Sequence, residues 1–242
     1  QTLAATHVVI ATGAEPVPLP FPGADLLATS TDVFDRDHLP EHVVFVGAGY
    51  VSLELARVAA AAGAEVVVLE MAERILPAFD PDLTARLADL TRDLGIDLRT
   101  GATVVGVRAE EPGFRVEVEG DDIGKETIAT GLVVHGAGRR PALAGLDLER
   151  AGVAHEPAGV TVDDDRRSTS DPAVFAVGDA AASGLWPLTP AAEHDARIVI
   201  DQLTSGHSAR PVSPALPSVA FTAPPIARVG LLESEARSRG LA

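Results

Sequence analysis

The stretch VVFVGAGYVSLELA, Val43–Ala56, decides the fold. Its apolar run Val43–Val46 is typical of a strand that is buried on both faces. The glycines that follow predict a tight turn, and Tyr50–Ala62 predicts a helix. Glu65–Leu69 then reads as a second buried strand. The stretch therefore opens a βαβ unit with parallel strands.

The turn has the spacing of a dinucleotide-binding loop. Gly47 permits the tight turn, and Gly49 has no Cβ, so a pyrophosphate can reach the N–H groups at the helix N-terminus. Ser52 stands where a third glycine is usual, and it is small enough for close packing of the helix on the strand. The loop with its flanking strand and helix predicts a nucleotide site.

Glu70 is the candidate that selects the nucleotide. It lies 23 residues after Gly47, near the ~20 expected for a carboxylate that binds the ribose hydroxyls. The alternative is an acid that ends a strand in solvent, and the agreement of the whole context favours the ribose role. A carboxylate there repels a 2′-phosphate, so we predict NAD(H) over NADP(H), although Arg74 follows four residues later.

The rest of the chain continues the α/β pattern. Asp80 is predicted to cap a helix that ends at Gly95, with Leu83, Leu87, Leu90 and Leu94 on one face. The alternation in FRVEVEG (114–120) predicts a half-exposed antiparallel strand. GLVVHGAG (131–138) and AVFAVGDAA (173–181) predict further strands that end in glycines, and Thr189 is predicted to cap a long helix.

Composition excludes several classes of partner. A net charge of −16 argues against nucleic acid and against an anionic membrane surface. The most apolar region is interrupted by Arg57 and Glu65, so no transmembrane helix is predicted. Without cysteine, the chain offers no disulfide, thiolate metal site or thiol chemistry, and no metal site is predicted. We predict a cytoplasmic protein.

Seven stretches in a fixed order resemble the pyridine nucleotide-disulfide oxidoreductases, which include glutathione reductase, dihydrolipoamide dehydrogenase and mercuric reductase. They run from residue 8 to residue 236. The stretches are VVIATGAEP (8–16), GAGYVSLELA (47–56), VVVLEMAERILPAFDPDL (66–83), GAGRRP (136–141), VFAVGDAA (174–181), PLTPAA (187–192) and FTAPPIARVGLLESEA (221–236).

The resemblance implies an α/β fold in which a Rossmann-like NAD(P)-binding domain is inserted in a partial FAD-binding domain. The inserted domain, 38–138, would combine a parallel sheet with an antiparallel β-meander. The FAD-binding segments would be 1–37 and 139–212, and 213–242 would begin a dimerisation domain. The family's first FAD-binding βαβ unit and its redox cysteines do not precede residue 8, and the chain starts without Met. We therefore expect a fragment, inactive by itself, of a homodimeric protein.

The resemblance also assigns roles to single residues. Tyr50 would be a gate that covers the flavin and moves aside for nicotinamide, with a surface aromatic as the alternative. Glu54 would face the flavin–nicotinamide junction, with a solvated helix acid as the alternative. Asp179 would bind the ribityl chain of FAD, and the helix N-terminus at Thr189 would face the flavin pyrimidine. The predicted catalytic residues are Tyr50 and Glu54; the predicted cofactor-binding residues are Thr12, Gly13, Gly47, Gly49, Tyr50, Val51, Glu70, Gly138, Gly178, Asp179 and Thr189.

The implied function is that of an FAD-dependent NAD(P)H oxidoreductase. A hydride would pass from NADH to FAD and onward to a disulfide or other small-molecule substrate. One alternative keeps the flavin but uses a non-disulfide acceptor such as a quinone, a metal ion, a ferredoxin or oxygen. The other is a non-catalytic NAD-binding module.

Overall fold

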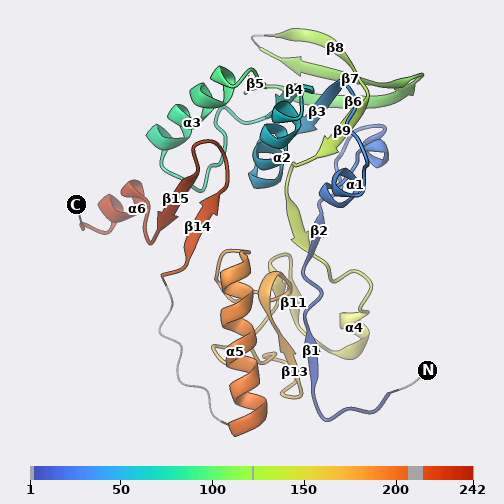
Figure 1. Cartoon of the computed structure of the whole chain (residues 1–242). Helices are drawn as coiled ribbons and strands as arrows, with labels where there is room; N and C mark the ends of the chain where they lie inside the picture. The colour runs from blue at the N-terminus through green and yellow to red at the C-terminus, as the bar shows by residue number, and fades with distance from the viewer. Residues whose placement is uncertain (1–2, 122, 207–214, 242) are drawn as a thin grey trace. The chain divides into compact units, whose positions relative to one another are not determined.

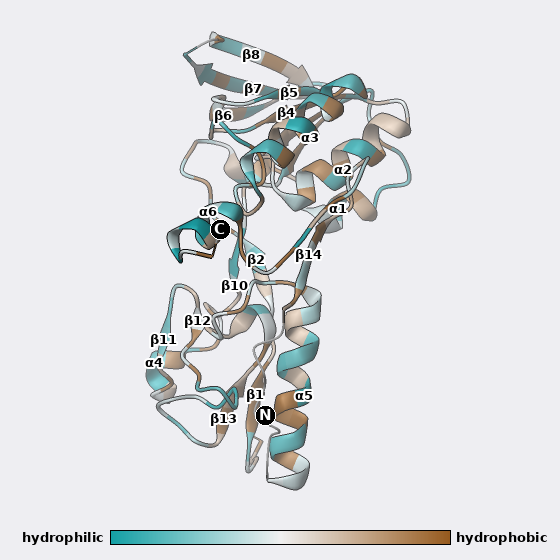
Figure 2. Cartoon of the chain, turned by 90° about the vertical axis from the view of Figure 1, so that its left-hand side faces the viewer, coloured by the Kyte–Doolittle hydropathy of each residue, from teal (hydrophilic) through white to brown (hydrophobic). Residues whose placement is uncertain are grey.

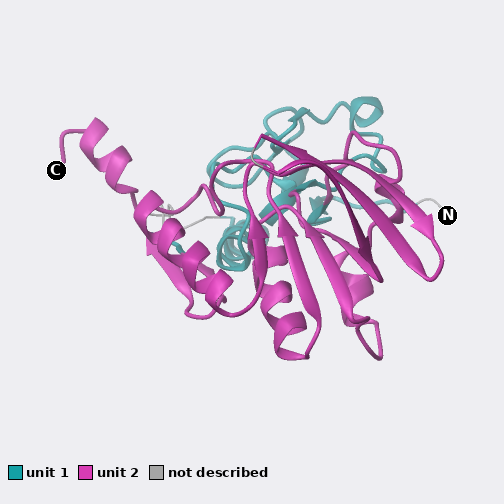
Figure 3. Ribbon diagram, turned by 90° about the horizontal axis from the view of Figure 1, so that it is seen from above, with its two compact units in different colours: residues 1–15, 139–217 teal, residues 16–138, 218–242 magenta. Residues whose placement is uncertain are grey.

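The computed structural model describes residues 3–121, 123–206 and 215–241 of the chain (Figure 1). The chain folds into two compact units, shown in different colours in Figure 3. Unit 1 comprises residues 1–15 and 139–217, and unit 2 comprises residues 16–138 and 218–242. Each unit therefore draws on two separate segments of the chain.

Unit 2 is built around a four-stranded sheet in the order β5-β4-β3-β9. All three strand pairs are parallel, which confirms the predicted Rossmann-like architecture. The strands are β3 (His42–Val46), β4 (Glu65–Leu69), β5 (Asp97–Arg99) and β9 (Leu132–His135). The crossovers are helices α2 (Tyr50–Ala61) and α3 (Pro81–Asp93).

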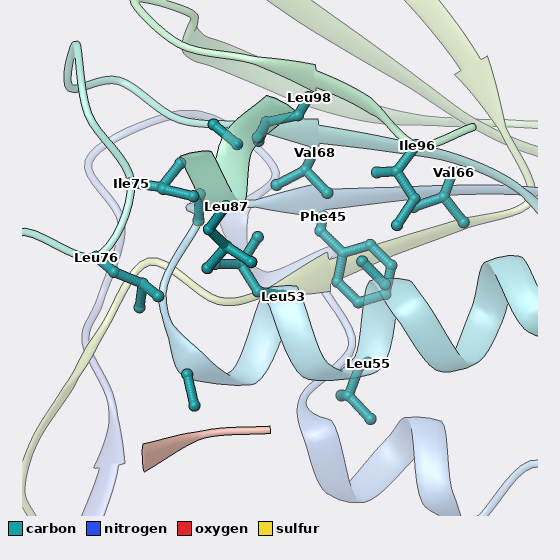
Figure 4. Close-up of a cluster of buried hydrophobic side chains, with 14 of the residues drawn as sticks. Phe45, Leu53, Leu55, Val66, Val68, Ile75, Leu76, Leu87, Ile96 and Leu98 are labelled. Carbon is teal, nitrogen blue, oxygen red and sulfur yellow. The ribbon is translucent and has the colours of Figure 1, made fainter. Parts of the chain in front are cut away.

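Both faces of this sheet are covered, as the continuous apolar run of β3 requires. Val43 and Phe45 point to a core shared with α2 and α3, part of which Figure 4 shows. Val44 and Val46 point to the opposite core, which the sheet shares with the β-meander. Full burial of each such side chain contributes about 1.5–3 kcal/mol, so these alternating contacts fix the register of β3.

The antiparallel β-meander lies in the order β6-β7-β8. Within β7, Val116 and Val118 are buried while Glu117 is exposed, which confirms the predicted two-residue alternation. The strands are β6 (Thr103–Glu110), β7 (Gly113–Gly120) and β8 (Gly124–Thr130).

The predicted leucine face of α3 is wrong at its ends. Leu83 and Leu94 are 45% and 50% exposed, whereas the buried face carries Leu87 with Thr84 and Thr91. Each threonine hydroxyl donates to a carbonyl of its own turn, at 3.0 and 2.8 Å. A satisfied hydroxyl can be buried at small cost, so the threonines take core places that the leucine pattern did not predict.

The C-terminal segment packs within unit 2. Ala220 of β14 and Ile226 of β15 join the core of α2 and α3. Asp80 precedes α3 as predicted but makes no side-chain cap there. Its Oδ1 instead accepts from the N–H of Glu233, at 3.0 Å, at the start of α6. The remaining elements of the unit are η1 (Ala24–Leu26), α1 (Ser30–Phe34), β14 (Pro217–Ala220), β15 (Ile226–Val229) and α6 (Glu233–Ser238).

Unit 1 is centred on the parallel pair β1 and β13. Its longest helix, α5, carries both hydrophobic and hydrophilic residues (Figure 2), and Gly206 ends it with a φ of 70°. The helix begins at Thr189, so the N-cap is Leu188 and not Thr189 as predicted. The elements are β1 (Val8–Ile10), β2 (Ala14–Pro16), β10 (Arg139–Pro141), α4 (Leu148–Ala151), β11 (His155–Glu156), β12 (Gly159–Val160), β13 (Val174–Ala176), η2 (Gly178–Ala180) and α5 (Thr189–Ser205).

By packing, residues 16–37 belong to unit 2 and not to the unit that holds β1. Residues 218–242 belong to unit 2 as well. The cofactor-binding and dimerisation roles predicted for the four segments stay predictions. No helix among the described residues is long and apolar enough to cross a membrane.

Candidate functional site

The turn between β3 and α2 needs its first glycine. Gly47 has a φ of 90°, and its N–H donates to the Leu69 carbonyl at 2.7 Å. A Cβ at this position would lie 2.6 Å from the Cα of Ala137. Gly49 is the N-cap of α2 and supplies no side chain to cap the helix. The N-terminal N–H groups of α2 are thus left to an anion or to solvent.

Ser52 explains how the helix tolerates the missing third glycine. Its side chain is fully buried, and a Cβ built on Gly136 would lie 1.7 Å from Ser52 Oγ. The close contact between helix and sheet therefore uses the glycine at the end of β9 in place of one in α2. Among the described residues Ser52 Oγ has no hydrogen-bond partner, so the hydroxyl fills space without a polar role.

Glu70 lies at the end of β4 and reaches back to the glycine turn. Its Oε2 accepts from the Ala48 N–H at 2.6 Å, and its Oε1 accepts from the Ala72 N–H at 2.9 Å. Two backbone donors fix the carboxylate beside the turn. The structure therefore brings Glu70 together with Gly47 and Gly49, as the spacing predicted.

The two arginines closest to Glu70 along the chain and across the sheet are both engaged. Arg74 donates to two carbonyls of its own loop, at 3.0 and 3.2 Å. Arg99 forms ion pairs with Asp97 and Glu126, each at 2.6 Å. The hydrogen bond to Asp97 and the charges of both acids raise the pKa of Arg99. Neither guanidinium is thus directed at the Glu70 carboxylate.

Tyr50 and Glu54 lie one helical turn apart on α2 and contact the C-terminal segment. The Tyr50 hydroxyl is 2.6 Å from Ser218 Oγ. Glu54 Oε1 accepts from the Phe221 N–H at 2.9 Å. Both side chains are partly buried. Val51, between them, packs at the edge of the core formed with α2.

The carboxyl ends of β1 and β13 bring the flavin-side candidates of unit 1 together. The Val177 N–H donates to the Ile10 carbonyl at 3.0 Å, which places the turn with Gly178 beside the end of β1. Gly13 follows β1 with a φ of 66° and open space where a Cβ would be. Thr12 beside it is exposed, and the partly buried Asp179 has no hydrogen bond or ion pair with any other described residue.

A buried ion pair that the sequence did not predict supports this turn. Asp195 of α5 is fully buried, and its Oδ1 accepts from Arg166 Nε at 2.6 Å. Its Oδ2 accepts from the Gly178 N–H at 3.0 Å. In the sequence Asp195 follows two other polar residues on a helix, so no local signal marks it as buried.

Gly138 lies at the end of the first segment of unit 2. It has a φ of 113°, and its carbonyl accepts from the Val17 N–H at 3.2 Å. A cavity of about 420 Å³ in the same unit lies elsewhere, at the amino ends of β3 and β4 around His42 and Glu65. It is therefore at the edge of the sheet opposite the glycine turn.

Comparison with protein families matches residues 1–196 to the pyridine nucleotide-disulphide oxidoreductases. The chain belongs to this family. A glutathione reductase of Burkholderia cepacia is 34% identical over 238 residues, which is 98% of this chain and 52% of the relative. A dihydrolipoyl dehydrogenase of Haloferax volcanii is 33% identical over 246 residues, or 99% of this chain and 50% of the relative.

A comparison with solved structures finds a similar fold in a flavoprotein disulfide reductase. The HOCl-induced flavoprotein disulfide reductase RclA from Escherichia coli is 31% identical, with a TM-score of 0.83 over 96% of this chain and 53% of RclA. The chain thus spans about half the length of the curated relatives it matches.

The residues of unit 2 fit a pyridine dinucleotide. An uncapped N-terminus of α2 can receive a pyrophosphate, and a carboxylate at the end of the next strand can accept ribose hydroxyls. In unit 1 the Asp179 carboxylate, which has no partner among the described residues, lies at a glycine turn whose Gly178 N–H donates to Asp195. It can therefore accept a hydrogen bond from the family's flavin. These features fit the ribityl role that the resemblance implies.

Proposed function

We propose that this chain is the nucleotide-binding part of an FAD-dependent NADH oxidoreductase that passes electrons to a disulfide. Residues 38–138 would bind NADH, and 1–37 with 139–212 would bind part of FAD. Residues 213–242 would begin the dimerisation domain. When bound, NADH supplies a hydride and FAD accepts it.

The observation that carries the proposal is the contact between Glu70 and the glycine turn. Glu70 Oε2 lies 2.6 Å from the Ala48 nitrogen, so the ribose acceptor and the pyrophosphate loop are adjacent. A ribose that binds Glu70 leaves its pyrophosphate at the N-terminus of α2, where N–H groups and the helix dipole favour negative charge. Membership of the family supports a pyridine nucleotide as that dinucleotide.

The charges around Glu70 support NADH over NADPH. A 2′-phosphate would approach the carboxylate, and it would need a cation to offset the repulsion. Arg74 is bonded to carbonyls of its own loop, and Arg99 is paired with two carboxylates. Binding NADPH would therefore require one of these arginines to give up its partners.

At the flavin side, Asp179 would accept a hydrogen bond from the ribityl chain, with Thr12, Gly13 and Gly178 lining the same edge. The N-terminus of α5 at Thr189 would direct its N–H groups at the flavin pyrimidine. Tyr50 would be the gate between the two rings, and Glu54 would face their junction. Val51 and Gly138 would line the nucleotide site.

For the whole protein we propose a cytoplasmic homodimer with a small-molecule disulfide as electron acceptor. The test is to purify the native protein and measure its intact mass, its flavin content and its reduction by NADH and NADPH. The proposal expects a flavoprotein about twice the length of this chain whose flavin is reduced faster by NADH. A flavin-free protein with the mass of this chain would support the non-catalytic module instead.

A further inference from the structure

We propose that Ser218 is a positioning residue that holds the Tyr50 side chain in a closed conformation. This conformation is defined by the hydrogen bond between the two hydroxyls. The inference rests on the proposed function, because it takes Tyr50 as the gate that nicotinamide must move. It assigns to the C-terminal segment an effect on nucleotide affinity.

Tyr50 is held from two sides. It is the first residue of α2, next to the N-cap Gly49. Its ring lies 5.9 Å from the ring of the fully buried Phe79, tilted by 50°, and its hydroxyl is 2.6 Å from Ser218 Oγ. Ser218 is only 5% exposed, so water competes little for this bond. A rotation of the Tyr50 side chain out of this position would break the hydrogen bond to Ser218.

Glu54 makes a second contact between α2 and the segment 218–221. It lies four residues after Tyr50, on the same face of α2, and accepts from the Phe221 N–H at 2.9 Å. Residues 218–221 thus contact both predicted catalytic side chains. A purely structural fastening is already provided by Ala220 and Ile226, which are buried in the core. The polar contacts are additional, and they fall on the first two turns of α2, next to the glycine turn.

The consequence for affinity follows from linkage. If nucleotide binding requires Tyr50 to leave its closed conformation, the free energy of the hydrogen bond between Tyr50 and Ser218 opposes binding. Removing the bond should tighten NADH binding by about five-fold, the effect of one net hydrogen bond. A residue that only stabilises the fold would change the unfolding transition and leave this affinity unchanged.

The test is an NADH titration of the full 242-residue chain, followed by nicotinamide fluorescence. Ser218→Ala and Tyr50→Phe each remove one side of the same bond. Each should lower the Kd about five-fold, and the double variant should lower it no further, because the bond can be lost only once. Ser238→Ala is the matched control, since its hydroxyl donates to the Glu235 carbonyl within α6 and to no other described residue. The Kd of this variant should equal that of the unmutated chain.

A second readout uses the fact that Tyr50 is the only tyrosine. Ring-labelled tyrosine gives one set of NMR signals, which should shift when NADH binds. If Ser218→Ala binds NADH as the control does, or more weakly, the role of Ser218 is overturned while the nucleotide site stands. If the unmutated chain binds no NADH, the proposed function itself fails.

Discussion

Replacing Gly136 by alanine tests the packing on which the dinucleotide turn depends. Gly136 follows β9, and its backbone does not need a positive φ. Any cost of the alanine is therefore steric. The new Cβ would lie 1.7 Å from Ser52 Oγ and 3.0 Å from Ser52 Cβ. Because Ser52 is fully buried, its hydroxyl has little room to turn out of the first overlap, and the second requires α2 to shift slightly away from the sheet.

Overpacking of a close contact costs about 1–3 kcal/mol. We expect Gly136→Ala to lie near the upper end, at about 2–3 kcal/mol, because Ser52 is fully buried. Ser52→Ala alone should be nearly neutral, since the removed hydroxyl has no partner among the described residues. In the double variant, loss of the hydroxyl removes the worst overlap, so the coupling between the two sites should be at least about 1 kcal/mol.

The assay is urea unfolding followed by far-ultraviolet circular dichroism, with the two single variants, the double variant and Gly145→Ala as control. A Cβ at Gly145 meets nothing within 4 Å, so this control should be neutral or slightly stabilising. A cost below about 0.5 kcal/mol for Gly136→Ala, or additive effects of the two sites, would refute the packing argument.

Three further predictions concern charges. Glu70→Arg should shift the ratio of NADH to NADPH affinity toward NADPH; if the unmutated chain already binds NADPH more tightly, the ribose role of Glu70 fails. Asp195→Ala should lower the free energy of unfolding by about 3–5 kcal/mol, because it leaves Arg166 buried and unpaired; a loss below about 1 kcal/mol in urea unfolding would contradict this. The Thr29 N–H and hydroxyl lower the pKa of Asp32, so its stabilisation of α1 is present at neutral pH and lost as the pH falls through the folded-state pKa. The protection factors of the α1 amides, which correct for the slower intrinsic exchange at lower pH, should fall over that acid range in the unmutated chain and should not change there in Asp32→Asn.

Features that depend on a local sequence pattern could be predicted from the sequence. The apolar run of β3, the glycine turn and the start of α2 follow from periodicity and from the conformational demands of Gly47. The alternation of β7 follows from its two-residue period. The placement of Glu70 beside the turn follows from the topology, because parallel strands end at the same edge of the sheet.

Contacts between distant segments were not predictable in this way. Asp80 was predicted to cap its own helix, but a second helix N-terminus, at Glu233, lies within reach of its carboxylate. The bond between Tyr50 and Ser218 joins residues 168 positions apart, and no local pattern relates them. Asp195 is buried because an arginine from another loop meets it. In each case a tertiary partner determines the role of a polar side chain.

The central claim is that the uncapped N-terminus of α2 holds the pyrophosphate of NADH, and Gly49→Asp tests it most directly. Gly49 has a φ of −82°, which any residue adopts, and Asp is a favoured N-cap. A Cβ there would lie 3.3 Å from the Gly136 carbonyl oxygen, a tight contact that a small shift relieves. The variant should therefore stay folded while its carboxylate occupies and repels the pyrophosphate position. We predict at least a ten-fold weaker Kd for NADH at unchanged or higher stability; a folded variant that binds NADH as tightly as the unmutated chain would contradict the account.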